Sequence, residues 1–330
     1  MNPVTRRRLV ADMPVSRSAL LALAVKLLLS AGLLFLVLAK VNVTSVLAVL
    51  SKANPWLVLL WYSLVPVTIA LAGWRWHVLA PGLSYKIATK YTWIGVFFGH
   101  VLPGSIAGDI AKGVSLALKD TAARTGLAAS IIAEKAIGLL ALLMFFDIAC
   151  AVVYLLHGDA SPQVRRLALL ALVLSLVALI ATAIAAFIAI RSRFAFTFTK
   201  PAVLAKLATG VATAARFYST RPSLLGKAFL ISVVIHVVNI IATYLSFRAL
   251  SIEAGLLFAS VVYPVVSVML LIPISISGIG VRDATLAVLF TLFGLSAASG
   301  VALSWLALIA VVPNVAIGGM IQLAEIYRKH

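Results

Sequence analysis

Long apolar segments alternate along the chain with short polar segments that are mostly basic. A helix needs about 20 residues to cross a hydrocarbon layer about 30 Å thick. Six continuous apolar segments are long enough: 19–39, 55–75, 125–157, 166–190, 224–250 and 298–324. They lack the short alternating pattern of outer-membrane barrel strands. The sequence therefore predicts an all-α polytopic membrane protein with about six full transmembrane helices.

Two further apolar stretches are interrupted by proline and glycine. Residues 91–102 and 107–118 flank the first break, and residues 256–272 and 281–293 flank the second. Most of these halves are too short to span a bilayer, and irregular backbone at membrane depth requires protein or a wet cavity around it. We therefore expect two re-entrant broken-helix hairpins. Their expected hinge residues are Pro103, Gly104, Gly108, Pro273, Gly278 and Gly280.

The distribution of cations sets the expected orientation. Hydrophobic residues make up 63% of the chain, its mean hydropathy is +1.15, and its formal charge is +18. Cations concentrate at residues 1–18 and 191–222, and an excess of Lys and Arg marks cytoplasmic loops. We expect a multi-pass protein of the inner (cytoplasmic) cell membrane with both termini cytoplasmic. No basic soluble module is present to bind nucleic acid, so the cations favour anionic lipid headgroups instead.

The two interrupted stretches resemble each other. Residues 102–118 read LPGSIAGDIAKGVSLAL and residues 272–288 read IPISISGIGVRDATLAV, an offset of 170 residues (272 − 102). The same offset carries the neighbouring spans onto each other, so a unit of span, hairpin and span occurs twice. With the expected orientation the two hairpins enter from opposite sides, which predicts an inverted repeat. Such repeats with broken helices are typical of secondary transporters, whose substrate site lies between the breaks.

The expected organisation has two parts. A basic cytoplasmic N-terminus at residues 1–18 precedes one integral membrane domain at residues 19–330. Within that domain we expect repeat halves at about 54–157 and 224–327, joined by the span at 166–190 and a basic interfacial segment at 191–222.

Ionisable side chains inside the predicted spans and hairpins form the candidate substrate site, because such groups are costly in a bilayer. Asp109 and Lys112 share one helical face. They either bind a lipid phosphate beside a helix N-terminus or form an intrahelical ion pair. Arg282 is either a bidentate ligand of a phosphate or carboxylate, or the partner of an acid elsewhere. The expected substrate-binding residues are Lys112, Arg282, Asp109, Asp283, Ser105, Ser275, Glu134 and Lys135.

Three other polar positions have less specific interpretations. Glu134 is either a proton or cation coupling site or one member of a static salt bridge, and spacing does not fix which acid pairs with which cation. Arg75 lies between Trp74 and Trp76, a pattern typical of an interfacial belt. We expect His236 to be a hydrogen-bonded packing group rather than a ligand.

Motifs for catalysis or for cofactor and metal binding do not occur in the sequence. His, Cys, Asp and Glu lack metal-ligand spacing, and neither a P-loop nor a G-x-S-x-G elbow is found. The single cysteine, Cys150, lies in an apolar run, where a packed thiol is expected. We therefore expect no cofactor, no metal and no enzymatic activity.

Three separated motifs carry a family resemblance: FFGHVLPGSIAGDIAKG at 97–113, AEKAIG at 133–138 and SGIGVRDA at 277–284. They resemble signatures of the lysylphosphatidylglycerol synthase transmembrane (flippase) domain family, and the resemblance covers nearly the whole chain. That family commonly has arginine at the position of Lys112, glycine at Ser277 and glutamate at Asp283. The resemblance implies a stand-alone member without the aminoacyl-transferase domain.

The resemblance also implies a function in lipid movement. The expected substrate is a phospholipid, an aminoacylated lipid, a hopanoid or a lipid-linked glycan that passes between leaflets. The alternatives are an intramembrane lipid-modifying transferase and an accessory subunit of a lipid-biosynthesis enzyme. Expected partners are therefore membrane lipids, especially those with anionic headgroups, and a lipid-biosynthesis enzyme; the sequence leaves the oligomeric state open.

Overall fold

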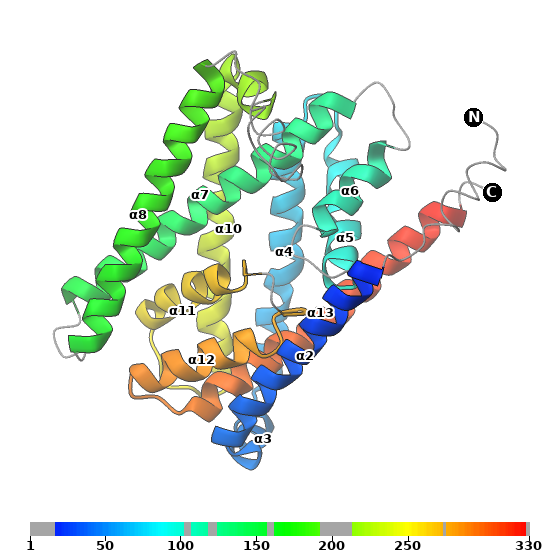
Figure 1. Ribbon diagram of the computed structural model, residues 1–330. Coiled ribbons are helices and arrows are strands. Elements are labelled where there is room, and N and C mark those ends of the chain that lie inside the picture. Colours follow the sequence, from blue (N-terminus) through cyan, green and yellow to red (C-terminus); the bar gives the residue numbers. More distant parts are fainter. Residues whose placement is uncertain are drawn as a thin grey trace.

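A computed structural model describes residues 17–101, 107–117, 124–156, 162–191, 213–272 and 275–327. In these ranges every regular element is a helix (Figure 1). The helices labelled in Figure 1 are α2 (Arg17–Lys40), α3 (Val43–Ser51), α4 (Pro55–Leu79), α5 (Tyr85–Val101), α6 (Ala107–Ala117), α7 (Arg124–Leu156), α8 (Pro162–Arg191), α10 (Pro222–Ala249), α11 (Leu256–Met269), α12 (Val281–Leu292) and α13 (Ala297–Tyr327). The all-α prediction is confirmed for these residues.

Four helices in the described part of the chain are long and apolar enough to cross a membrane, namely α4, α7, α10 and α13. A fifth span results if Leu27–Lys40 of α2 and α3 are counted together, although the chain bends by 87° between them. The remaining expected span, 166–190, lies within α8. The protein is therefore a multi-pass membrane protein.

Asparagine side chains start two of the helices at the bend after α2. The Oδ1 atom of Asn42 accepts a hydrogen bond of 2.8 Å from the backbone N–H of Thr44, and α3 begins there. Asn54 caps α4 in the same way, and Pro55 occupies the first turn, where no intrahelical donor is needed. The chain therefore passes from α2 to α3 across residues 41–42 and from α3 to α4 across residues 52–54.

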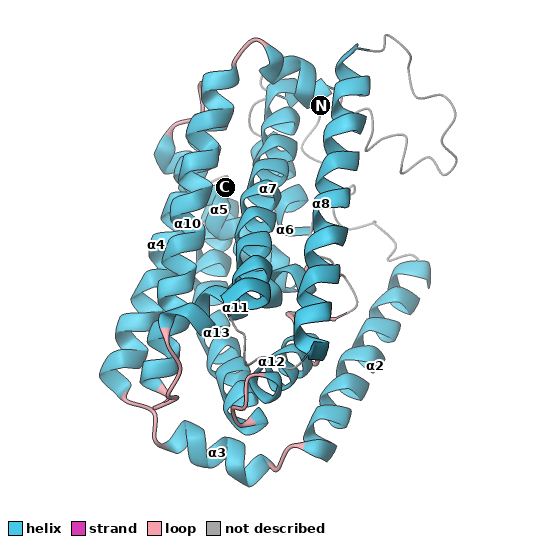
Figure 2. Ribbon diagram, turned by 90° about the vertical axis from the view of Figure 1, so that its left-hand side faces the viewer, coloured by secondary structure: helices cyan, strands magenta, loops and turns pink. Residues whose placement is uncertain are grey.

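The long helices form a row in which α4 packs on α10, α10 on α7, and α7 on α8 (Figure 2). The shorter helices pack around this row. Helix α5 packs on α4 and α13, and α11 packs on α10 and α7. Helix α12 lies between α13 and α2. Each broken pair is thus held against long helices from both ends of the chain.

A buried aromatic cluster fixes the second broken pair. The rings of Phe247 in α10, Phe258 in α11 and Phe290 in α12 have centroids 5.2 to 5.9 Å apart. Tilted and edge-to-face pairs of this kind add about 0.5–1.5 kcal/mol each beyond the burial of their area. Val301 of α13 is fully buried in the same cluster, which therefore joins four helices.

Glycines allow the closest helix contacts in the first broken pair. A methyl group at Gly108 of α6 would overlap the carbonyl oxygen of Gly95 and lie 3.0 Å from the Cα atom of Gly99, both in α5. In the second pair, Gly278 and Gly280 have φ angles of 78° and 82°, which favour glycine. The expected hinge residues Pro103, Gly104 and Pro273, and the expected site residue Ser105, lie outside the described residues.

Candidate functional site

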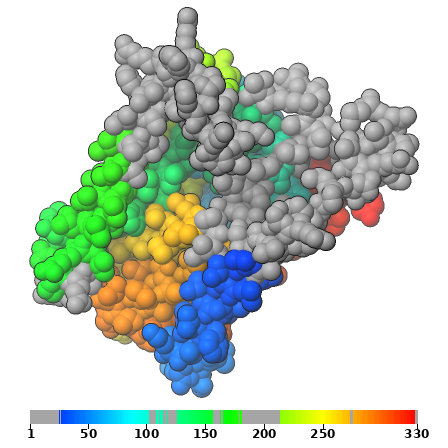
Figure 3. Space-filling model, in the orientation of Figure 1, coloured from blue at the N-terminus to red at the C-terminus, as the bar shows by residue number. Residues whose placement is uncertain are grey.

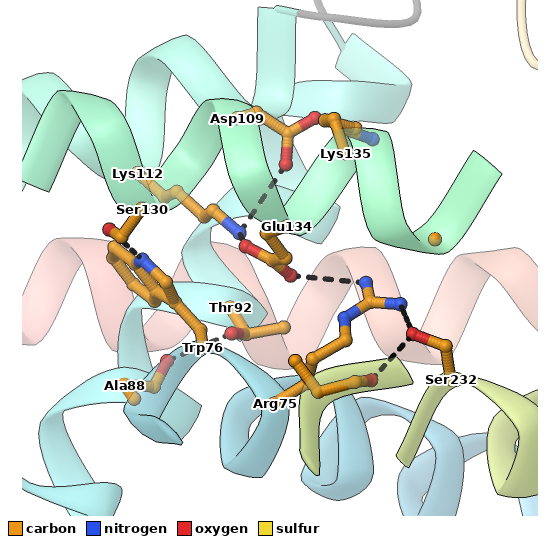
Figure 4. Close-up of polar contacts among 12 residues, drawn as sticks. Arg75, Trp76, Ala88, Thr92, Asp109, Lys112, Ser130, Glu134, Lys135 and Ser232 are labelled. Atoms are coloured by element: carbon orange, nitrogen blue, oxygen red, sulfur yellow. Dashed lines mark hydrogen bonds and ion pairs between the residues drawn. The ribbon is translucent and has the colours of Figure 1, made fainter. Parts of the chain in front are cut away.

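A buried carboxylate joins two cations from different helices. Glu134 of α7 lies with its Oε2 atom 2.5 Å from the Nζ atom of Lys112 in α6 and its Oε1 atom 3.2 Å from the Nη2 atom of Arg75 in α4 (Figure 4). The side chains of Lys112 and Glu134 are only 3% and 5% exposed. Of the two interpretations of Glu134, this geometry matches the salt bridge, because both of its oxygen atoms contact cations.

Two further ion pairs extend this cluster to its partly exposed edge. Asp109 lies with one oxygen atom 3.4 Å from the Nζ atom of Lys112 and the other 2.7 Å from the Nζ atom of Lys135. We call Arg75, Lys112, Glu134, Asp109 and Lys135 the ion network. It holds three cations and two carboxylates, so its formal charge is +1.

Neighbouring polar and aromatic groups position the two buried cations. Trp76 places its ring 4.5 Å from the Nζ atom of Lys112, and its indole N–H donates to Ser130 at 3.0 Å. The second terminal nitrogen of Arg75 donates to the hydroxyl of Ser232 in α10 at 3.0 Å. A methyl group at Gly138 would lie 3.0 Å from the guanidinium of Arg75, so the glycine leaves room for it.

The sequence pattern named no partner for Arg75. It was expected at the membrane interface beside two tryptophans, and the structure pairs its side chain, which is only 14% exposed, with Glu134. Sequence reasoning also missed Ser130 and Ser232, which lie in apolar runs with no local signal. For Arg75 the available signal was the acid–base pair Glu134-Lys135, because a buried acid requires a cation from another helix.

In the second broken pair, Arg282 contacts a hydroxyl instead of an acid. Its Nε atom donates to the Oγ atom of Ser304 in α13 at 2.9 Å. No acid of the described residues lies within ion-pair distance of it. The adjacent Asp283 accepts a hydrogen bond of 2.8 Å from the backbone N–H of Gly280, while its buried Oδ1 atom has no partner among the described residues.

The Arg282–Ser304 contact has a counterpart in the ion network. Lys112 and Arg282 are 170 residues apart (282 − 112), and so are Glu134 and Ser304 (304 − 134). In each half a cation near the start of the short helix therefore contacts the same position of the following long helix. The acid Glu134 of the first half corresponds to Ser304 in the second half. Of the two cations, only Lys112 is therefore neutralised by an acid at this position of the long helix.

The two broken pairs also meet directly. The hydroxyl of Ser277, just before α12, lies 3.5 Å from the carbonyl oxygen of His100 at the end of α5. Ser275 is partly exposed in the same turn. His236 has the expected packing role, since its ring nitrogens lie 2.8 Å from the hydroxyl of Tyr263 and 3.3 Å from the carbonyl oxygen of Gly138.

Comparison with known proteins gives one match. A family model described as the lysylphosphatidylglycerol synthase TM region matches residues 23–318. The comparison with curated proteins gives no match, and neither does the comparison with solved structures. The matched range includes the ion network, Arg282 and Ser304.

Proposed function

Because the chain belongs to the lysylphosphatidylglycerol synthase TM region family, we propose that it moves a lipid between the two leaflets of the cytoplasmic membrane. Family membership supports a role in lipid handling, and the apolar helices place the chain in a membrane. The substrate class is a lipid with an anionic group, and both termini face the cytoplasm. A lipid-biosynthesis enzyme that supplies the lipid is the proposed protein partner.

The positions of the helices support an inverted repeat with halves at about 54–157 and 224–327. Shifted by 170 residues, α4, α5, α6 and α7 would cover 225–249, 255–271, 277–287 and 294–326, close to α10, α11, α12 and α13. The packing is also equivalent in the two halves. The short helix α5 of the first half packs on the long helix α13 of the second half, and α11 of the second half packs on α7 of the first. Transporters built this way carry the substrate between the paired broken helices and alternate by rocking one half against the other.

The observation that carries the proposal is the different pairing of the two equivalent cations. Lys112 is buried between Glu134 and Asp109, so its charge is compensated within the protein. Arg282 is held by Ser304, which orients the guanidinium without neutralising it. A guanidinium binds phosphate in a bidentate fashion. We therefore assign headgroup binding to Arg282 and a structural role to Lys112.

The test uses the full-length protein in liposomes, with a leaflet-specific assay of fluorescent phosphatidylglycerol and phosphatidylcholine. Ser304→Glu gives Arg282 the acid that Lys112 already has, and Arg282→Gln removes the cation. Both variants are expected to lose movement of phosphatidylglycerol. Arg248→Gln, which removes an exposed arginine at the end of α10, is expected to keep it.

Stability measured in detergent separates loss of folding from loss of transport. Normal movement of phosphatidylglycerol in folded Ser304→Glu and Arg282→Gln would contradict the assignment of Arg282 and leave the transport function standing. Chemical turnover of the lipid by the wild-type protein without transbilayer movement would contradict the transport function itself and favour a lipid-modifying transferase.

A further inference from the structure

An apolar hollow lies apart from the ion network, between α2 and α12. It has a volume of about 520 Å³, and its walls are formed by residues from Leu33 to Val41 on one side and from Ala284 to Leu292 on the other. The two helices lie next to each other on the face shown in Figure 3, α2 in blue and α12 in orange. We call this hollow the α2–α12 groove.

The groove is distinct from the site around Arg282. Helix α12 lines the groove with Ala284, Ala287 and Val288 and the following turn, whereas Arg282 is directed to Ser304 of α13. Of the described residues that line the groove, only Lys40 carries a charge. The groove therefore offers apolar walls of small and branched side chains with one cation.

The position of Lys40 along α2 places this cation at one end of the groove. Helix α2 ends at Lys40, and the chain then turns by 87° into α3, so Lys40 lies at the end of the apolar helix. Leu33 lies about 10 Å further along the helix axis, at a rise of about 1.5 Å per residue. Lysine stems extend along apolar surface and keep their ammonium groups at the membrane interface. Lys40 is thus the charged end of the groove, and Leu33 lies in its apolar part.

The lining of the groove suits an alkyl chain. Such a chain is flexible, and it matches apolar walls without any polar partner along its length. Thr291, on the α12 wall, is the one uncharged polar residue of the described lining, and its hydroxyl already donates to the carbonyl oxygen of Ala287.

We propose that the α2–α12 groove is a binding site for an anionic phospholipid, with one acyl chain between the two helices and the phosphate at the ammonium group of Lys40. This site does not depend on the transport function proposed above, because it needs only stable occupancy. A zwitterionic phospholipid has the same chains and a phosphate, but its own cationic group competes with Lys40 for that phosphate.

The test measures binding in full-length protein in nanodiscs that contain photoactivatable phosphatidylglycerol or phosphatidylcholine with a diazirine in one acyl chain. Mass spectrometry locates the crosslinks. We expect crosslinks on residues 33–41 and 284–292, with a higher yield for phosphatidylglycerol. Ala287→Trp fills the groove and should reduce both yields to background. Leu28→Trp is the control, because Leu28 lies on α2, one of the two groove helices, is 73% exposed and does not line the groove.

Charge is tested with Lys40→Gln. This change should lower the ratio of phosphatidylglycerol to phosphatidylcholine crosslinks by about fivefold, which corresponds to about 1 kcal/mol for one interfacial lysine. Lys52→Gln is the matched control, since Lys52 lies exposed at the end of α3 and outside the groove lining.

Two results would overturn the proposal. Unchanged crosslinks in Ala287→Trp would mean that the groove is not the site. Equal yields for the two lipids, unaffected by Lys40→Gln, would mean that the occupant is not selected by its charge.

Discussion

Replacing Glu134 by glutamine should destabilise the protein more than any other single change in the ion network. Gln keeps the shape of the side chain and removes the charge that Lys112 and Arg75 share, so the change tests electrostatics and not packing. Lys112 is 3% exposed and Arg75 is 14% exposed, so neither cation gains much water when the acid is lost. Removing one partner of a buried ion pair costs about 3–5 kcal/mol.

The other members of the network give a graded comparison. Lys112→Met leaves Glu134 paired with Arg75 and Asp109 paired with Lys135, so we expect a loss of about 1.5–3 kcal/mol, the range of one charged hydrogen bond. Lys135 is 57% exposed, and Lys135→Gln should cost no more than about 1 kcal/mol, as for a surface ion pair.

The assay is reversible unfolding by sodium dodecyl sulfate in mixed micelles, followed by circular dichroism, with all three variants in the same lipid and at the same pH. The expected order of destabilisation is Glu134→Gln, then Lys112→Met, then Lys135→Gln. If Glu134→Gln lowered the free energy of unfolding no more than Lys135→Gln does, the acid would not hold the two buried cations. The structural role given to Lys112 would then be refuted.

Three further changes test single contacts. Gly108→Ala should cost about 1–3 kcal/mol in the same assay because its methyl group would overlap the carbonyl oxygen of Gly95, whereas Gly226→Ala, with open space around its position, should not destabilise. Gly280→Ala should cost at least about 1 kcal/mol, since its φ is 82° and its methyl group would lie 2.8 Å from the carbonyl oxygen of Ser30. Burial raises the pKa of Tyr218 from 10.0 to about 12. The buried phenol should therefore stabilise the fold fully below pH 10, and this stabilisation should be lost as the pH rises to about 12. Ultraviolet titration of the phenolate, compared with Tyr218→Phe, checks this.

The positions of the long helices could be predicted because membrane crossing is a local property of length and apolarity. The expected span at 224–250 is α10 (Pro222–Ala249), and the one at 298–324 is α13 (Ala297–Tyr327). The bend after α2 could not be predicted in this way, because α3 has only nine residues. Its local signal is Asn42, which caps α3 directly after the bend, and Asn54 caps the next helix, α4, in the same way.

The partners of the charged residues could be predicted only in part. The sequence named Asp109, Lys112, Glu134 and Lys135 as candidates, and the structure brings all four together. It did not give Arg75, because that cation comes from the end of α4 and meets Glu134 across a helix interface. Spacing within one helix fixes which side chains share a face, but the partner on the facing helix depends on how far the two helices slide and rotate.

The two equivalent contacts, Lys112–Glu134 and Arg282–Ser304, differ in a way that folding alone does not explain. A buried cation without an acid costs several kcal/mol, and an apolar side chain of similar volume would pack in its place at a lower cost. At Lys112 the acid removes this cost, and it also ties α6 to α7. At Arg282, which is partly exposed, a serine orients the guanidinium, and the adjacent Asp283 lies beyond ion-pair distance, so the guanidinium remains open to an external anion. A lipid phosphate that arrives during transport would supply that anion only while it is bound, and this is why an acid introduced at Ser304 should stop transport without unfolding the protein.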